Sequence, residues 1–517
     1  MTSKNVIAQS LKQPKSISII GGGISGLSAA YYASKAFPAT KVHLFEASDR
    51  LGGWINSERI NLGNYGTALI ESGPRTLRPN GVSGALVLDL LFTDSKQIDK
   101  LGLESSLLSA SKSSPAAKNR FIYHPDRLNQ LPSSLASIPS ALLKYKTLRA
   151  IPAAILNDIK TPAHKREENE DESVDAFFRR RFGDKIADNI ASAVIHGIYA
   201  TDSRHLSLRT AFPLLYKLEQ RAGSVVKGLL KGVGKDKKEE ALELAILDGI
   251  SPSLRATMQT ASIFSFKNGI SEIVQTLESA LHKNSNVEIY KSSPVKAITQ
   301  QPNKDFVIDT QNGLSLESSH LISSIPAKQL SLQKLKLSIP VLKSPDVAVV
   351  TLVYPQTELP ITGFGYLIPR STPRQKNPHG VLGVVLDSDA MPKQDPKPIT
   401  KLTVMLGGPY GLKSFDDDHL KNMAIETAVN QLSDNLHTPI ASKVSVARSC
   451  IPTYPPGYQS TLQELHDSLS TDYDSRFAVI GSSFTGISVG DCVRSGWETI
   501  ESYKAFGKAT GLERWKR

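Results

Sequence analysis

A glycine-rich turn between two short hydrophobic runs constrains the fold of this chain more than any other feature. Residues 16–20 form a β-branched run, residues 21–26 read Gly-Gly-Gly-Ile-Ser-Gly, residues 24–36 carry many small side chains, and residues 41–45 form a second hydrophobic run. A strand, a helix and a strand within about thirty residues make a βαβ unit. Because the glycines match G-x-G-x-x-G at the junction of strand and helix, the unit predicts a dinucleotide-binding domain.

Each part of this turn has an expected role in holding a dinucleotide. Gly21 allows the tight turn, Gly23 lets the backbone approach a pyrophosphate, and Gly26 lets the helix pack on the strand. The helix N-terminus donates N–H groups to phosphate. Glu46 ends the second strand, where a carboxylate accepts hydrogen bonds from ribose hydroxyls. The expected cofactor-binding residues here are Gly21, Gly22, Gly23, Ile24, Ser25, Gly26 and Glu46.

The residues after Glu46 resemble a flavin-binding signature. Residues 46–54 read Glu-Ala-Ser-Asp-Arg-Leu-Gly-Gly-Trp, which is similar to the E-x-x-x-R-x-G-G signature of the amine oxidase-like flavoproteins. An arginine here can neutralise a phosphate, and adjacent glycines let the main chain pass close to a cofactor. We therefore expect FAD rather than NAD, with Trp54 either touching the flavin or packing within the protein. The candidate residues are Ala47, Arg50, Gly52, Gly53 and Trp54.

A second glycine-rich turn near the carboxyl end matches the closing flavin motif of the same proteins. Residues 476–480 form a hydrophobic strand, residues 481–496 carry the motif, and a helix is expected from near Gly490. The amides at the start of this helix would face the flavin and stabilise its anionic reduced form. The candidate residues are Gly481, Gly486, Ile487, Ser488, Val489 and Asp491. Neither Cys450 nor Cys492 is placed for covalent attachment, so one non-covalent FAD per chain is expected.

The length of the chain allows more than one packed unit. With 517 residues it exceeds the size at which one core stops growing, about 250–300 residues. We expect α/β and α+β architecture: a Rossmann-like FAD-binding domain built from discontinuous segments, a mixed-sheet substrate domain and a helical membrane-binding domain. The predicted FAD-binding segments are 14–95, 260–330 and 446–517, the predicted helical domain is 96–259, and the predicted substrate domain is 331–445.

An excess of basic residues suggests that the chain meets an acidic partner. Lys and Arg number 61 against 49 Asp and Glu, a net charge of +12, which suits nucleic acid, an anionic lipid surface or an acidic substrate. Residues 128–162 mix apolar residues with Lys144, Lys146, Arg149 and Lys160, which favours short basic amphipathic helices on a membrane surface. No run approaches the roughly 18 apolar residues of a membrane-spanning helix.

Residues 71–75 read Glu71-Ser72-Gly73-Pro74-Arg75, and further motifs are spread along almost the whole chain. These motifs resemble those of protoporphyrinogen oxidase, the oxygen-dependent, mitochondrial type, and the first is similar to the E-x-G-P-R segment of that family. Further matches lie at residues 171–174, 196–200, 363–369, 382–388 and 402–408. The pattern is followed less well at residues 61–68, 454–456 and 223–240, the last of which is rich in Gly and Lys and is expected to be an exposed loop or insertion.

This resemblance implies an activity, partners and a location. The family oxidises protoporphyrinogen IX to protoporphyrin IX with FAD in three two-electron steps, with oxygen as acceptor and hydrogen peroxide as product. A homodimer is expected, attached peripherally to the inner mitochondrial membrane on the intermembrane-space side. Ferrochelatase is a candidate partner, and nucleic acid is not expected. The first 45 residues contain no Asp or Glu, which is typical of a mitochondrial targeting segment.

The resemblance also implies roles for single residues. Arg75 corresponds to the arginine that meets a substrate propionate, and the backbone at Gly197 approaches the substrate. The apolar residues that flank the tetrapyrrole are Phe364, Leu367 and Met405, and the cofactor-side positions are Gly73, Pro74, Val295 and Ser324. The flavin carries the chemistry by accepting a hydride at N5, so no catalytic side chain and no metal site is expected. His196 is interpreted as a structural histidine.

Two other functions share the cofactor motifs. An amine oxidase of the same fold, acting on polyamines or aromatic amines, would favour an aromatic cage near the flavin, whereas this chain offers Arg75 for an anion. A non-catalytic, FAD-containing membrane scaffold is the other alternative, suggested by the basic residues 128–162. Reduction of the flavin by a substrate would separate an enzyme from a scaffold.

Overall fold

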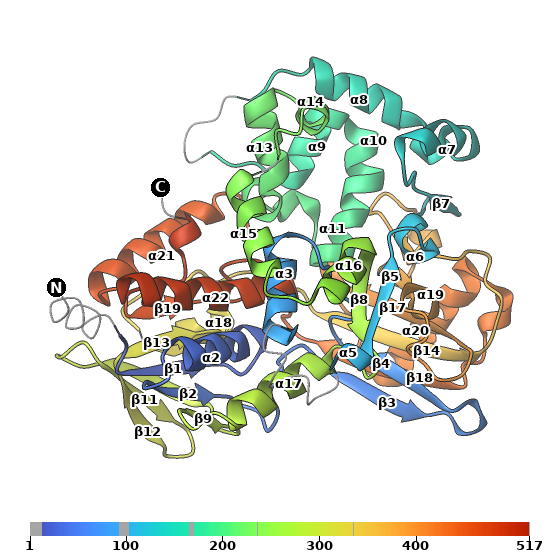
Figure 1. Ribbon diagram of the computed structural model, residues 1–517. Coiled ribbons are helices and arrows are strands. Elements are labelled where there is room, and N and C mark those ends of the chain that lie inside the picture. Colours follow the sequence, from blue (N-terminus) through green and yellow to red (C-terminus); the bar gives the residue numbers. More distant parts are fainter. Residues whose placement is uncertain (1–12, 93–102, 165–169, 235, 334, 516–517) are drawn as a thin grey trace.

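A parallel sheet, a mixed sheet and a lobe of helices make up the molecule, and the helical lobe lies at the top of Figure 1. The computed structural model describes residues 13–92, 103–164, 170–234, 236–333 and 335–515. Within these ranges no helix is both long and apolar enough to cross a membrane.

The strands of the parallel sheet come from both ends and the middle of the chain. In spatial order they are β19 (Phe477–Val479), β13 (His320–Ser323), β1 (Ser16–Ile20), β2 (Lys41–Phe45) and β9 (Val287–Tyr290). All neighbouring strands run parallel. Ile19 and Phe45 are buried, as expected for a parallel sheet that is covered on both faces.

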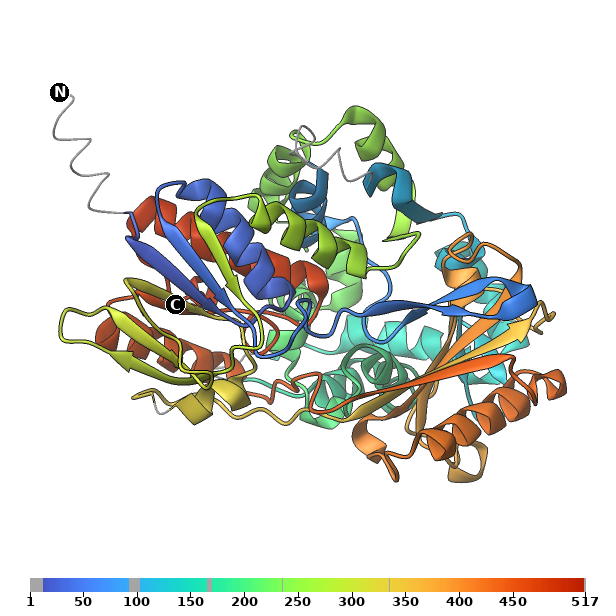
Figure 2. The ribbon, with the colours of Figure 1, turned by 90° about the horizontal axis from the view of Figure 1, so that it is seen from below.

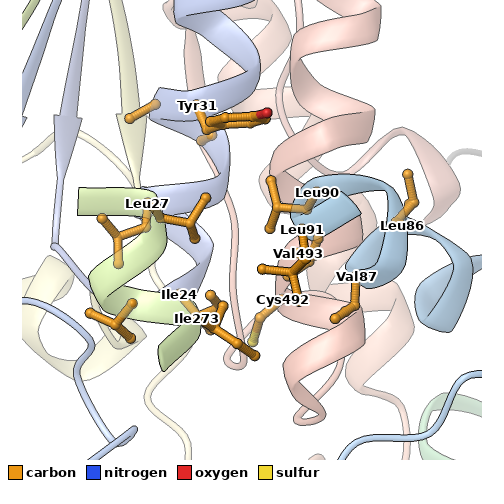
Figure 3. Packing of buried hydrophobic residues seen from close by; sticks show 14 of the residues in the cluster. Ile24, Leu27, Tyr31, Leu86, Val87, Leu90, Leu91, Ile273, Cys492 and Val493 are labelled. Carbon is orange, nitrogen blue, oxygen red and sulfur yellow. The ribbon is translucent and has the colours of Figure 1, made fainter. Parts of the chain in front are cut away.

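Small residues let two helices pack closely beside this sheet. α2 (Ile24–Ala36) lies against α22 (Val489–Phe506), and a Cβ placed on Gly496 would lie 2.9 Å from the backbone N of Ala29. Any larger residue at this position would push the helices apart. Figure 3 shows the apolar side chains between these helices, α3 (Gly81–Phe92) and α17 (Ser271–His282), among them Leu27, Leu90, Leu91, Ile273 and Val493.

A smaller antiparallel sheet completes this part of the molecule. Its strands are β10 (Val295–Gln300), β11 (Phe306–Thr310) and β12 (Ser315–Ser318). α21 (Tyr458–Asp472) shares a core with it, in which Phe306 and Leu469 are fully buried.

The mixed sheet has seven strands. In spatial order they are β18 (Ala441–Ala447), β14 (Val347–Pro355), β17 (Ile399–Gly407), β16 (Val381–Leu386), β15 (Gly365–Leu367), β6 (Arg120–Tyr123) and β7 (Leu128–Gln130). α20 (Asp417–Gln431) covers one face, on which Val350 and Val404 are buried. Because side chains alternate along a strand, Val349 and Met405 point to the opposite face.

A hairpin connects the parallel sheet to the mixed sheet. It consists of β3 (Ser57–Asn61) and β4 (Thr67–Glu71), and seen from below it extends alongside the mixed sheet (Figure 2). Ile70 of β4 packs against Val353 of β14. The end of β4 therefore delivers residues 71–75 to the space between the two sheets.

Buried charges hold the helical lobe together. The guanidinium of Arg181 is fully buried and bonds Asp158 at 2.5 Å and Glu219 at 2.9 Å. A buried cation needs such partners, because desolvation without them is costly. The helices of the lobe include α7 (Ile138–Lys144), α8 (Ile151–Lys160), α9 (Val174–Phe182), α11 (Ser192–Tyr199), α13 (Pro213–Ala222) and α14 (Val225–Leu230).

Of two local expectations for this region, the loop at residues 223–240 is wrong and the helices at residues 128–162 are present over most of that range. Residues 223–240 do not form a loop, because α14 and the start of α15 (Lys237–Leu247) lie there. The side chains of Ser224 and Asp236 accept hydrogen bonds from the first turns of these helices, and such N-caps stabilise a helix start. Residues 128–162 contain α7 and α8 but begin with strand β7, which pairs with β6.

The prediction of the fold class is confirmed. A Rossmann-like parallel domain is assembled from distant segments, a mixed sheet lies beside it, and a helical lobe covers one side. The residue borders of the domains stay predictions.

Candidate active site

The first glycine turn has a geometry that larger residues would not allow. Gly21 has φ +100°, and its N–H donates to the carbonyl of Phe45 at 2.8 Å. A Cβ on Gly26 would lie 1.9 Å from the carbonyl oxygen of Gly21. Ser324 closes the turn from behind, since its hydroxyl donates to Gly21 O at 2.9 Å. These contacts fix the strand, the turn and α2 relative to one another.

Gly23 differs from its neighbours because it faces open space. A Cβ built there would meet only the Cα of Gly53, at 4.0 Å. Gly23 is also the N-cap of α2 and supplies no side-chain cap, so the first amides of the helix are available to an anion. The second glycine pair, Gly52 and Gly53, lies alongside the first turn, because the N–H of Gly52 donates to Gly22 O at 2.8 Å. The open space at Gly23, the free amides at the start of α2 and the neighbouring glycines fit the diphosphate of a dinucleotide.

Glu46 and Arg50 are oriented for the rest of a cofactor. Glu46 Oε2 accepts from Gly22 N at 2.7 Å, and Oε1 accepts from Ser48 N at 2.8 Å. Arg50 donates to carbonyls of its own loop, including Gly53 O at 2.8 Å. Among the described residues no carboxylate pairs with Arg50, so its positive charge is left for an anionic group. Ala47 lies exposed next to Glu46.

The closing motif meets the first turn at the start of α22. The hydroxyl of Ser488 accepts from Asp491 N at 3.0 Å, which caps the helix. Gly486 has φ +141°, and a Cβ there would lie 2.7 Å from Asp491 Oδ2. A Cβ on Gly481 would lie 3.0 Å from the hydroxyl oxygen of Ser25, on the glycine turn of α2. The predicted meeting of the two ends of the chain is therefore present.

The two apolar residues of the closing motif pack into the protein. Ile487 packs into the core shared with α21, and Val489 packs beside α2 and α3.

The remaining cofactor-side candidates lie around this site. A Cβ on Gly73 would lie 2.1 Å from Trp54 O, so the segment with Pro74 passes directly against the Trp54 loop. The Trp54 side chain is 47% exposed, which leaves its surface free for a ligand. Val295 follows Ser293, whose N–H donates to Glu46 O at 2.8 Å. Sequence motifs far apart in the chain thus converge on one place.

Three of the substrate-side candidates lie on or against the face of the mixed sheet opposite to α20. A Cβ on Gly197 of α11 would lie 2.5 Å from Leu367 Cδ2. Leu367 pairs in register with Gly383, which in turn pairs with Met405. Gly383 was not singled out from the sequence. Because it has no side chain, it leaves room for Leu367.

Phe364 lies at a different place from these three. Its ring packs with Ala110, Ile263 and Met391, and its N–H donates to Asn119 O at 3.1 Å. The chain turns between Phe364 and Leu367, because Gly365 has φ +131°. The two residues therefore pack against different neighbours, and their shared role at the substrate stays a prediction.

Arg75 is already paired within the protein. Its Nη1 lies 2.6 Å from Asp387 Oδ1, and Asp387 Oδ2 accepts from the Thr403 hydroxyl at 2.6 Å. The two charged side chains are only 13% and 11% exposed. A substrate propionate would have to compete with Asp387, and the role of Arg75 as its anchor stays a prediction.

Buried charges next to this pair were missed by the sequence analysis. Burial raises the pKa of Glu71 to about 7, although Ser57 Oγ and Ile270 N donate to it and the nearby charge of Arg75 opposes the rise. Lys401 Nζ lies 2.6 Å from Asp395 Oδ2. Glu71, Arg75, Asp387 and Lys401 line one small cavity. Only the motif around Arg75 could have drawn attention to this region.

The helix with Gly197 is fastened to the mixed sheet by polar contacts. His196 Nδ1 donates to Ile368 O at 2.8 Å, and burial lowers the pKa of His196, so it is held as a neutral structural group. Arg370 pairs with Asp188 at 2.7 Å and with Asp202 at 3.1 Å. These contacts fix α11, and thereby Gly197, against Leu367.

The similarity to known proteins agrees with this geometry. Residues 24–499 match the family described as flavin containing amine oxidoreductase. Protoporphyrinogen oxidase of Schizosaccharomyces pombe is 38% identical, over 94% of this chain and 97% of that protein. The chain belongs to the protoporphyrinogen oxidase family.

Other members of the protoporphyrinogen oxidase family support the same assignment. The human protoporphyrinogen oxidase is 33% identical, over 94% of this chain and 98% of that protein. A solved structure described as a putative protoporphyrinogen oxidase from Exiguobacterium sp. 255-15 has a TM-score of 0.72 at 22% identity, covering 95% of this chain and 99% of that chain, and shows the shared fold. The predictions of the family, of an oxidoreductase and of FAD as cofactor are confirmed.

Proposed function

We propose that the chain catalyses the FAD-dependent oxidation of protoporphyrinogen IX to protoporphyrin IX, the last oxidation before iron enters the macrocycle in haem formation. The observation that carries the proposal is the 38% identity to a protoporphyrinogen oxidase along nearly the whole of both chains. A match over 94% of this chain extends far beyond either glycine turn and takes in the strands of the mixed sheet. The function therefore rests on the complete site rather than on the cofactor motifs alone.

The cofactor side of the site has the groups that FAD needs. The α2 amides and the space at Gly23 suit the diphosphate, while Glu46, held by Gly22 N, suits a ribose. The N-terminus of α22, capped by Ser488, brings partial positive charge to the place where the two glycine turns meet. When bound, FAD supplies the hydride acceptor for the reaction.

The substrate side is apolar where Gly197, Leu367 and Met405 meet. A flat macrocycle loses water contact on such a surface, and this favours its binding. The absence of a side chain at Gly197 keeps the helix backbone close to the surface of Leu367. These residues are proposed to position the ring, and no side chain is assigned as a general base, since His196 Nδ1 is bound to Ile368 O.

Oxygen is proposed as the final electron acceptor. Removal of six hydrogens from the porphyrinogen would then consume three molecules of oxygen and release three of hydrogen peroxide. The test is to measure oxygen, peroxide and porphyrin together with protoporphyrinogen IX and, separately, with polyamines and aromatic amines. With the porphyrinogen, we expect three molecules of oxygen consumed and three of hydrogen peroxide released for each protoporphyrin IX formed. Turnover of amines alone would favour the amine oxidase alternative, and no turnover at all would favour the scaffold.

Peripheral attachment to an anionic membrane is proposed for the helical lobe. Leu143 of α7 is 81% exposed and Leu230 of α14 is 76% exposed. Basic residues lie on the same helices or beside them, including Lys144, Lys146, Arg149, Lys160, Lys227 and Lys231. Exposed apolar residues and nearby cations are what an interfacial helix needs.

The location and the macromolecular partners are proposed from the family resemblance. The inner mitochondrial membrane, on its intermembrane-space side, is the proposed site of attachment. A homodimer and docking of ferrochelatase belong to the same proposal. The acid-poor N-terminal residues support mitochondrial import, although residues 1–12 lie outside the described ranges.

A further inference from the structure

The segment after β15 runs alongside α11 and the turn before it. His196 Nδ1 donates to Ile368 O at 2.8 Å, and Ser192 Oγ accepts from Arg370 N at 3.2 Å. Residue numbers fall along the helix as they rise along the segment, so the two run antiparallel. The position of α11 is therefore fixed by the residues that directly follow Leu367.

A π-helical turn precedes α11 and sets its rotation. This turn is η5 (Ala187–Ala191), and α11 begins at the next residue. A π turn holds one residue more than an α turn, and one residue of an α-helix corresponds to a rotation of about 100°. The directions in which the α11 side chains point therefore depend on this turn being kept.

The rotation of α11 decides which residue faces Leu367. In the structure this residue is Gly197, and a Cβ there would lie only 2.5 Å from Leu367 Cδ2. Ile198 is 44% exposed and lies about 100° further around the helix. A rotation by one residue would bring a larger side chain onto Leu367 and change the width of the space beside it.

Arg370 fastens the π turn to the mixed-sheet side of the molecule. Its guanidinium donates to Asp175 of α9, to Asp188 of η5 at 2.7 Å and to Asp202, which follows α11, at 3.1 Å. It also donates to Ser203 Oγ at 2.9 Å. One cation thus joins three segments of the helical lobe, and its side chain is only 14% exposed.

Ser371 holds the same turn through a second set of contacts. Its hydroxyl lies 3.1 Å from Asp188 O and 2.6 Å from Asn189 Oδ1. Arg179 also pairs with Asp188, but it belongs to the helical lobe itself and does not reach the segment after β15. Loss of Arg370 would leave Asp175 and Asp202 mostly buried with a weaker counter-charge, so the turn should move.

We propose that Arg370 is a positioning residue for the porphyrinogen, because it keeps the π turn in place and thereby holds Gly197 against Leu367 at the width that a flat macrocycle needs. The inference rests on the proposed function and adds to it a residue that sets the shape of the substrate site. Arg370 acts through α11 and takes no part in the transfer of hydrogen.

Product binding and substrate kinetics measure this role. Protoporphyrin IX is titrated into the oxidised, FAD-loaded wild type, Arg370→Gln and Arg370→Lys, and KM and kcat are measured with protoporphyrinogen IX. Arg370→Gln should bind the product roughly 10- to 100-fold more weakly and raise KM to a similar extent. The FAD content and kcat should change much less, because the flavin site is built from other elements. Arg370→Lys should recover part of the affinity, since a positive charge remains among the carboxylates.

Arg204→Gln is the matched control. Arg204 also pairs with Asp202, but it lies in η6 (Ser203–His205), after α11, rather than in the segment after β15. This variant should bind protoporphyrin IX as wild type does. Ser371→Ala leaves no charge unpaired and should show the same change as Arg370→Gln to a smaller extent, so it carries the test if Arg370→Gln does not fold.

A double-mutant cycle with Leu367→Ala separates positioning from a general loss of stability. If Arg370 acts through the contact of Gly197 with Leu367, Arg370→Gln should cost less affinity in the Leu367→Ala background than in wild type. Equal losses in both backgrounds, unchanged affinity in Arg370→Gln, or an equal loss in the Arg204 control would overturn the role of Arg370 while leaving the proposed function intact. A wild type that binds no protoporphyrin IX and oxidises no protoporphyrinogen IX would overturn both.

Discussion

Arg75 and Asp387 form an ion pair, with 2.6 Å between the guanidinium Nη1 and the carboxylate Oδ1. They are 312 positions apart in the sequence, and the pair joins the end of β4 to α19 (Asp387–Ala390) after β16. It therefore connects the FAD-side segment with Gly73 to the mixed sheet that carries Met405.

Removal of one partner of this pair should destabilise the protein. Arg75→Ala leaves Asp387 with a mostly buried, uncompensated charge, and we expect a loss of about 3–5 kcal/mol in the free energy of unfolding. Urea unfolding of the FAD-saturated protein measures this loss. The double variant Arg75→Met with Asp387→Leu should recover most of it. An Arg75→Ala variant as stable as wild type would show that the pair is not desolvated in solution.

Gly23 and Gly26 should respond differently to the same substitution. Gly23→Val places its side chain in open space, so the fold should persist while FAD is lost. Gly26→Val should disrupt the fold itself, because its Cβ would overlap Gly21 O. Flavin absorbance per chain and circular dichroism of both variants check this difference. Full flavin content in Gly23→Val would contradict the assignment of the diphosphate site.

The glycine turns and the helices after them could be predicted from the sequence because their determinants are local. The glycine turns at 21–26 and 481–490 adopt conformations that depend on neighbouring residues, so their positions and the helices after them follow from the motif. The helices at residues 225–247 were missed because their start signals, Ser224 and Asp236, stand among many Gly and Lys residues.

The substrate side was harder to predict because its contacts are distant in sequence. The pairing of Arg75 with Asp387 depends on where β16 ends relative to β4, and no local pattern reports this. The motif near residue 365 does not reveal that Phe364 packs with Ala110, Ile263 and Met391 while Leu367 lies against Gly197, because these contacts come from distant segments.

His320 should make stability fall in mildly acidic solution. Burial lowers the pKa of His320 to about 4, although its hydrogen bond to Gly507 O opposes this shift. The unfolded chain, with an ordinary histidine pKa near ~6.5, binds the proton first. Stability is therefore full above about pH 6.5 and declines down to about pH 4, by up to about 3 kcal/mol.

The comparison that isolates this effect is wild type against His320→Gln, with unfolding followed from pH 7.5 to pH 4. The variant should be less stable at pH 7.5 but lose less stability on acidification. The difference between the two proteins removes the contribution of Glu71, which titrates in the opposite sense because its pKa is raised to about 7. Parallel curves for the two proteins would contradict a neutral buried His320.

Attachment to lipid should depend on the exposed leucines of the helical lobe. Leu143→Glu combined with Leu230→Glu should weaken sedimentation with anionic vesicles, because it removes apolar insertion and adds repulsion. Phe506→Glu is the matched control, since Phe506 is 71% exposed but lies at the end of α22. Equal loss in the control, or none in the leucine variant, would assign binding to another surface.

The central claim is that the bound flavin accepts electrons from a porphyrinogen. The most direct measurement mixes the oxidised, FAD-loaded protein with protoporphyrinogen IX without oxygen and follows the flavin absorbance and the formation of protoporphyrin IX. We predict that the flavin bleaches with the porphyrinogen, and that it stays oxidised with a polyamine or an aromatic amine. A flavin that stays oxidised with the porphyrinogen, or that is reduced by an amine instead, would contradict the account.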